Sequence, residues 1–194
     1  MNYSSAIKSF AMTNMLLEAD LDSIEEKYQI DLGRNVQRKS AIEDVYYPQF
    51  DEALRAEARR MSQHYEIFYC LEKSIRQLIT DVFETTENSD WWSELVPQAV
   101  RQNAEKSIKR ERQSAVTRRS TEPIDYTTFG ELSEIIKSNW ELFGGAVFDD
   151  LRAMEKVMSA LNSLRNPIAH CSPLAEDEVM RLDLALRDWF RIIS

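Results

Sequence analysis

Apolar residues recur at alternating intervals of three and four positions along most of this chain, a spacing that places them on one face of an α-helix. The sequence has only four glycines and five prolines among its 194 residues, so little of it can form the turns that link short strands. Strong helix formers such as Glu, Arg, Ala and Leu are abundant. We therefore expect an all-α protein, with one domain and a helical arm at this length.

The first stretch of this pattern, from Tyr3 to Tyr28, has the heptad spacing of a helix that packs along another helix. Its apolar members are Ile7, Phe10, Leu17, Leu21, Ile24 and Tyr28. Asn14 occupies one seam position and could fix the register of a two-stranded dimer. Alternatively, the helix lies on its own domain, because fewer than about four heptads is weak evidence for a coiled coil. We assign residues 1–59 to this helical arm and a connector, and residues 60–194 to a helical-bundle domain.

Five further apolar patterns predict the helices of the bundle. We expect them at about residues 49–83, 98–119, 128–143 and 148–164, with the last one following Ser172. Thr128 and Glu131 have the spacing of a capping box, and Gly144-Gly145 ends the helix that they begin. Ser172-Pro173 has the composition of an N-cap and first helical position, which predicts where the last helix begins.

The charge of the chain is uneven. The formal net charge is -9, which argues against a protein that coats nucleic acid non-specifically. The segment from about residue 98 to 119 is basic, however, and is the one obvious surface that could face a polyanion. Its candidate RNA-binding residues are Lys106, Lys109, Arg110, Arg112, Arg118 and Arg119. The alternative is a solvated helix face, since most charged runs are that. Bases could stack on Trp91, Trp92 or Tyr126, although aromatic residues more often belong to the core.

Several other classes of function find no support in the sequence. Cys70 and Cys171 cannot form a disulfide framework, which suggests a reducing compartment, and we expect a cytoplasmic protein. Polar residues interrupt the N-terminal apolar stretch, so we expect no signal peptide and no membrane span. Together with His64 and His170, the cysteines match no familiar zinc spacing. Without a glycine-rich phosphate loop or another nucleotide-binding motif, we expect no metal and no cofactor.

The hexapeptide Arg165-Asn166-Pro167-Ile168-Ala169-His170 contains the most informative grouping of reactive side chains. On an unbroken α-helix, two residues five positions apart differ by about 140° around the axis and do not share a face. Proline removes a backbone donor and disfavours the α conformation at the preceding residue. We therefore expect the helix to break within the hexapeptide, with Arg165 and His170 converging.

Arginine and histidine together can cleave RNA without a metal. An arginine is a permanent forked cation suited to phosphate, and a histidine near neutral pH can take a proton from a ribose 2′-OH or give one to the leaving oxygen. One histidine in a chain does not serve easily as both base and acid, so a two-fold dimer with two copies of the motif is expected. The structural alternative is an ordinary helix ending at a basic residue, Asn and Pro.

Arg165, Asn166 and His170 match the signature of the HEPN superfamily, an Arg followed by four to six residues and a His, commonly with Asn after the Arg. Over about residues 60–194 the chain is similar to the Swt-type branch of that superfamily. The similarity extends to Tyr65, Glu72 and Arg76, to Trp91-Trp92 and Pro97, to the Tyr126–Trp140 segment, and to Pro173-Leu174 after the hexapeptide.

This resemblance implies a HEPN-type helical bundle and a metal-independent endoribonuclease that acts as a homodimer. It implies proton transfer by His170, phosphate binding by Arg165 and positioning by Asn166, with Glu72 of the first core helix near the site unless it only pairs with Arg76. Such proteins often serve as toxins or phage-defence effectors that cut tRNA or other RNA, with a possible antitoxin partner. The alternative is a non-catalytic dimerisation or partner-binding module, because the superfamily also contains inactive members.

Overall fold

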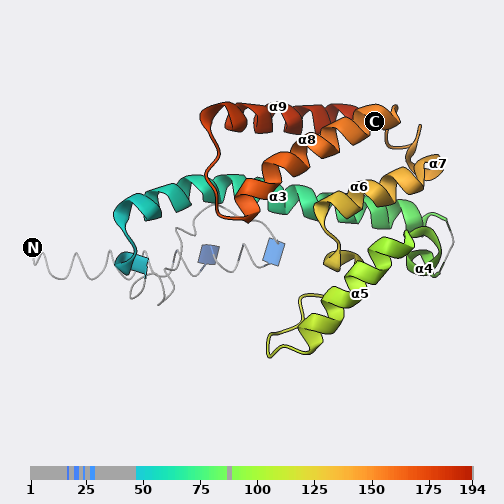
Figure 1. Cartoon of the computed structure of the whole chain (residues 1–194), viewed down its shortest axis with the longest axis horizontal. Helices are drawn as coiled ribbons and strands as arrows, with labels where there is room; N and C mark the ends of the chain where they lie inside the picture. Colours follow the sequence, from blue (N-terminus) through green and yellow to red (C-terminus); the bar gives the residue numbers. More distant parts are fainter. Residues whose placement is uncertain are drawn as a thin grey trace, which may run out of the picture. The chain divides into compact units, whose positions relative to one another are not determined.

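Seven α-helices make up most of the computed structural model, which describes residues 47–86 and 89–193 together with Leu17, Asp20, Leu21, Ile24, Lys27 and Tyr28. No strand occurs among these residues, so the predicted all-α class is confirmed. The α-helices are α3 (Glu52–Glu84), α4 (Trp91–Leu95), α5 (Gln98–Arg112), α6 (Phe129–Ser138), α7 (Trp140–Phe143), α8 (Leu151–Ala169) and α9 (Glu176–Ile192), and the 3₁₀-helices are η1 (Tyr47–Gln49) and η2 (Pro123–Tyr126) (Figure 1).

The chain divides into two units, Met1–Glu52 and Ala53–Ser194. Within the first unit, the rings of Tyr47 and Phe50 pack edge to face with centroids 6.4 Å apart. The predicted heptad helix falls in this unit, where Leu17, Leu21, Ile24 and Tyr28 are helical. The rest of its seam, Asn14 included, lies outside the described residues. The second unit holds α3 to α9, and every feature discussed below belongs to it.

α3 supplies the central apolar face of the second unit. Phe68, Leu71, Ile75, Ile79 and Phe83 are buried and recur every three or four positions. The ring of Phe83 lies 5.7 Å from that of Phe143 and 5.4 Å from that of Trp91, which joins α3 to α7 and α4. No residue of α3 before Phe68 is fully buried, although Met61 is partly buried against the core.

α8 and α9 lie side by side, and α6 packs across α8 (Figure 1). Phe148, immediately before α8, is fully buried between Trp189 of α9 and Trp140 of α7, with ring centroids 5.6 and 6.3 Å away. Phe148 was expected within a helix, but Asp150 caps α8 by accepting a hydrogen bond from Ala153 N–H at 2.8 Å. α8 therefore begins at Leu151, because the cap fixes its first turn.

Two predicted helices are shorter than their apolar patterns suggested. Thr128 and Glu131 form the predicted capping box of α6, but the helix stops at Ser138. There the buried Asn139 side chain donates hydrogen bonds to Leu95 O and Ile135 O, both at 2.9 Å, and the chain restarts as α7. α5 ends at Arg112 rather than at Arg119, because residues 113–122 fold back toward the helix. Periodicity does not distinguish a continuous helix from two helices that share an apolar face.

The start of the last helix was predicted three residues too early. Ser172 N–H donates to Pro167 O at 2.8 Å, so Ser172 completes the end of α8 instead of capping α9. α9 begins at Glu176, and Glu178 accepts a hydrogen bond from Ala175 N–H at 3.1 Å. That carboxylate satisfies one of the free donors at the start of the helix.

Candidate functional site

The hexapeptide forms the last turn of α8. The helix continues through Pro167 to Ala169, so the predicted break inside the motif is wrong. Buried Leu164 and Ile168 keep this turn packed, and that packing offsets the hydrogen bond that proline cannot make. The helix ends in a Schellman motif: Cys171 adopts a left-handed conformation (φ 56°), and the N–H groups after His170 donate back to the last turn.

Because the helix does not break, Arg165 and His170 do not converge. His170 caps the helix, and its N–H donates to Asn166 O and Pro167 O, both at 3.1 Å. The side chains of Asn166 and His170 are exposed, and neither makes a hydrogen bond to another described residue. Arg165 is only partly exposed and turns toward α3. Within one chain the structure therefore separates the cation from the imidazole.

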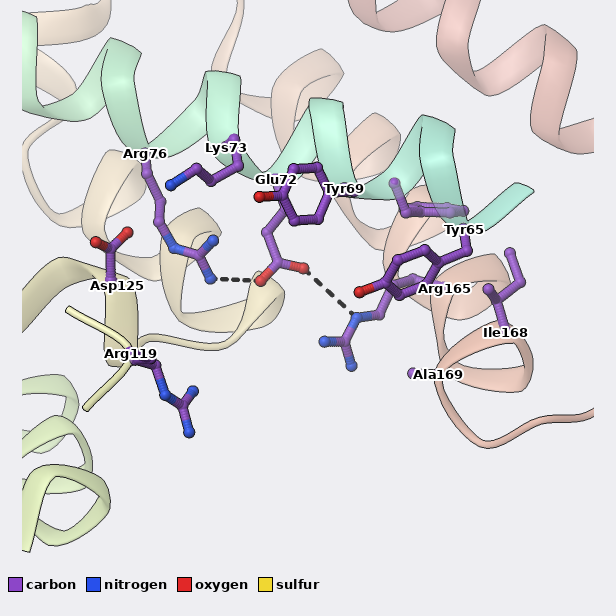
Figure 2. Close-up of a pocket in the computed structure, with 11 residues that line it drawn as sticks. Tyr65, Tyr69, Glu72, Lys73, Arg76, Arg119, Asp125, Arg165, Ile168 and Ala169 are labelled. Atoms are coloured by element: carbon purple, nitrogen blue, oxygen red, sulfur yellow. Dashed lines mark hydrogen bonds and ion pairs between the residues drawn. The ribbon is translucent and has the colours of Figure 1, made fainter. Parts of the chain in front are cut away.

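Glu72 of α3 lies between two guanidinium groups (Figure 2). Arg76 Nη2 donates to Glu72 Oε1, and Arg165 Nε lies 3.6 Å from Glu72 Oε2, which is an ion pair rather than a hydrogen bond. Glu72, which the family resemblance suggested near the site, thus lies beside Arg165. Its carboxylate draws Arg165 toward α3 and fixes the direction of that side chain.

Arg76 does more than pair with Glu72 along α3. Its side chain and that of Glu72 are 13 and 16% exposed. Arg76 Nε donates to Ile124 O at 3.2 Å and Nη2 to Thr127 O at 2.9 Å, which ties α3 to η2. The position of Glu72 is therefore fixed by Arg76, whose Nε and Nη2 are both hydrogen-bonded to backbone carbonyls.

Arg165 and Glu72 line a pocket of about 240 Å³ between α3, the end of α8 and the segment before η2 (Figure 2). The remaining lining residues are Tyr65, Phe68, Tyr69, Lys73, Arg76, Arg119, Asp125, Ile168 and Ala169. Four of the eleven are cationic and two are acidic, in a chain whose net charge is -9. A partly open pocket with this excess of positive charge suits an anionic group.

Arg119 reaches the pocket from a different part of the chain. Its Nε donates to Glu111 Oε1 at 2.9 Å and its backbone N–H to Glu111 Oε2 at 3.1 Å, while its guanidinium lies 4.9 Å from the ring centroid of Tyr126. The Tyr126 hydroxyl also donates to Glu111, at 2.5 Å. These hydrogen bonds, first that of Tyr126 and then that of Arg119, lower the pKa of Glu111 from 4.5 to about 2.

The other basic residues predicted to meet RNA lie away from this pocket. Lys106, Lys109, Arg110 and Arg112 are exposed along α5, and Arg118 donates to the Tyr126 hydroxyl at 3.4 Å. Of the aromatic residues considered for stacking, Tyr126 is buried and Trp91 and Trp92 pack against the core.

Sequence reasoning missed the pocket roles of Tyr69 and Lys73. The spacing of Tyr65, Tyr69, Glu72 and Arg76, three or four positions apart, was the available signal, because it places all of them on one face of α3.

No group of three or more His, Cys, Asp or Glu side chains that could hold a metal ion occurs in the described part of the chain. Cys70 and Cys171 are free and exposed. None of the helices in residues 47–86 and 89–193 is both long enough and apolar enough to cross a membrane.

Comparison with known proteins identifies the family. The model of the Swt1-like HEPN family matches residues 66–194, which include α4 to α9, most of α3 and every residue that lines the pocket except Tyr65. No curated protein and no solved structure matches the chain. Because the matched segment is more than half of the chain, the protein belongs to the Swt1-like HEPN family.

Proposed function

We propose that this protein is a metal-independent endoribonuclease that acts as a homodimer. Membership in the Swt1-like HEPN family supports an RNase or a nucleotide-binding module. The observation that carries the finer proposal is the position of Arg165. It lines a pocket with an excess of cations, five residues before the exposed His170. The guanidinium of Arg165 and the imidazole of His170, brought together from two copies of the chain, are the groups that RNA cleavage through the 2′-OH needs.

In the proposed reaction the 2′-oxygen of a ribose attacks the adjacent phosphorus, and the bond from phosphorus to the 5′-oxygen of the next nucleotide breaks. One imidazole accepts the proton of the 2′-OH, and another donates a proton to the departing 5′-oxygen. Arg165 neutralises the charge that develops on the phosphate oxygens. Asn166 positions the phosphate, and Glu72 is a positioning residue that acts through Arg165. The products are a 2′,3′-cyclic phosphate and a 5′-hydroxyl.

The arrangement of α8 supports a site shared by two chains. Arg165 and His170 are five positions apart at the end of a continuous helix, where side chains at this spacing do not share a face. A two-fold axis near the end of α8 would bring the two copies of the hexapeptide together and supply both a base and an acid. RNA, including tRNA, is the proposed substrate, and a toxin or phage-defence role with a partner that restrains the enzyme fits such an activity.

Incubation of purified protein with total RNA in excess chelator tests the proposal. We expect new 5′-hydroxyl ends at defined positions, and their loss in the His170→Ala variant. Replacing the target ribose by 2′-deoxyribose in a synthetic substrate removes the nucleophile and abolishes cleavage at that position.

His64→Ala is the matched control, because the chain contains only these two histidines and His64 lies outside the hexapeptide. The His64→Ala variant is expected to retain cleavage. Cleavage that survives His170→Ala contradicts the nuclease proposal. Absence of new ends with wild-type protein across several RNA classes favours the non-catalytic dimerisation or partner-binding module instead.

A further inference from the structure

We propose that the pocket beside Arg165 binds one unpaired nucleotide of single-stranded RNA, next to the phosphate that is cut. Arg119 and Lys73 bind a neighbouring phosphate, and Tyr65 and Tyr69 stack on a base. This inference rests on the proposed nuclease function and names the part of the substrate that determines specificity.

Two of the four cations that line the pocket have no carboxylate or carbonyl that occupies all of their donors. Glu72 already pairs with Arg76 and Arg165, and Arg76 also donates to Ile124 O and Thr127 O. Lys73 is exposed and makes no ion pair within the described residues. Arg119 uses its Nε on Glu111 and leaves its terminal nitrogens without a partner among the described residues. Two cations therefore remain available at the pocket, and phosphate suits both.

Arg119 is held in place before any ligand binds. Glu111 accepts hydrogen bonds from both the Nε and the backbone N–H of Arg119, and the guanidinium lies over the ring of Tyr126. Glu111 is itself fixed by the Tyr126 hydroxyl. A side chain that is already ordered loses less entropy on binding, so its contact with a phosphate gains affinity. The Arg119 side chain is 57% exposed and lines the pocket, so a phosphate can reach it.

Two tyrosines of α3 present exposed rings at the pocket. Tyr65 and Tyr69 are 60 and 57% exposed, one helical turn apart, with ring centroids separated by 6.3 Å. Exposed rings at the edge of a cationic pocket offer the π-faces on which unpaired bases stack. Bases in an A-form duplex are already stacked and are not available to them. The combination therefore selects single-stranded RNA.

The size of the pocket favours a segment of a polymer over a free small molecule. Its volume of about 240 Å³ is below the range of roughly 300–1,000 Å³ that is usual for small-molecule sites. Asp125 lies on the same side of the pocket as Arg76, away from Arg165 (Figure 2). The side of the pocket at Arg165, where the phosphate that is cut binds, therefore lies away from the Asp125 carboxylate.

Fluorescence anisotropy of full-length protein with a labelled, fully 2′-O-methylated single-stranded oligonucleotide measures binding without cleavage. Arg119→Ala is expected to weaken binding at least about fivefold. It should also reduce the slope of log affinity against log salt by about 0.7, the value for one lost phosphate contact on a single strand. Arg152→Ala, which removes an exposed arginine at the other end of α8, should change neither.

The double variant Tyr65→Ala/Tyr69→Ala is expected to weaken binding by about fivefold to a hundredfold, and Tyr65→Phe/Tyr69→Phe should retain it, because phenylalanine keeps the stacking face. A duplex of the same sequence should bind wild-type protein more weakly. Urea unfolding of each variant checks that the fold is intact.

Three results would overturn the inference: equal losses for Arg119→Ala and Arg152→Ala, unchanged binding by the Tyr65→Ala/Tyr69→Ala variant, or equal affinity for duplex and single strand. Its failure is separable from failure of the nuclease proposal. Normal binding by Arg119→Ala with cleavage lost in His170→Ala rejects only the nucleotide subsite. Weakened binding by Arg119→Ala with no cleavage by wild-type protein rejects only the nuclease.

Discussion

Replacing Arg76 by methionine tests how the site is held together. The side chain that is lost donates to Ile124 O and Thr127 O and pairs with Glu72, and both members of the pair are less than one fifth exposed. A hydrogen bond that involves a charged group contributes about 1.5–3 kcal/mol. Two such bonds to carbonyls, at the low end of that range, give about 3 kcal/mol. An exposed helical pair would contribute only about 0.3–0.5 kcal/mol.

Arg181→Met is the matched control for Arg76→Met. Arg181 pairs with Asp177 at the same spacing of four, but the two side chains are 70 and 58% exposed. We therefore expect Arg181→Met to change the free energy of unfolding by less than about 0.5 kcal/mol, because solvent screens this pair. Methionine keeps the length and helix propensity at both positions, so the two variants differ mainly in burial.

Urea unfolding followed by tryptophan fluorescence is the assay. All four tryptophans lie in the unit that contains the site, so their signal reports on that unit. With a typical m of about 2 kcal/mol/M, Arg76→Met should lower the unfolding midpoint by about 1.5 M at unchanged m. If Arg76→Met costs no more than Arg181→Met, the tie between α3 and η2 does not support the site, and the reasoning is wrong.

Two further substitutions probe the neighbouring structure. The Tyr126 hydroxyl is the main cause of the low pKa of Glu111, which is about 2 instead of 4.5. The charge of Glu111 therefore stabilises the fold above about pH 4.5, and this stabilisation is lost as the pH falls toward 2. Glu111→Gln should therefore have a lower free energy of unfolding than wild type at pH 7. Urea unfolding at a series of pH values should show this difference shrinking between about pH 4.5 and 2. A difference that stays constant with pH contradicts the assignment. Asn139→Ala removes the amide that donates to Leu95 O and Ile135 O, and should lower the free energy of unfolding by about 1–3 kcal/mol in the same assay. An unchanged free energy of unfolding would mean that water replaces the amide.

Helical periodicity predicted the elements of the bundle better than it predicted their ends. The buried stripe of α3 from Phe68 to Phe83 and the capping box at Thr128 were evident from the sequence, because both are local. The interruption at Asn139 was not evident, since it depends on Leu95 O, a partner far away in the sequence. The end of α8 was not evident either. It depends on the hydrogen bond from Ser172 N–H to Pro167 O, whereas a serine followed by proline has the composition of a helix start.

The candidate site shows the same division. The hexapeptide was found by its pattern and Glu72 through the family resemblance, and the structure brings Glu72 next to Arg165. Arg119 was predicted on a basic helix with five other cations, whereas it lies in a loop and lines the pocket. Its position depends on Glu111 and Tyr126, which join residues of a helix, a loop and a 3₁₀-helix. Composition alone cannot separate one ordered cation from a group of solvated ones.

The continuous helix through Pro167 makes dimerisation more important to the proposed chemistry. A break at the proline would have let Arg165 and His170 meet within one chain, but α8 extends to Ala169 and keeps them on different faces. His170 then needs a phosphate that its own Arg165 does not hold, or a second chain that completes the site. Two-fold symmetry provides both imidazoles and both guanidiniums at one phosphate. A protein that sedimented as a monomer at the concentration where it cleaved RNA would therefore contradict the composite site.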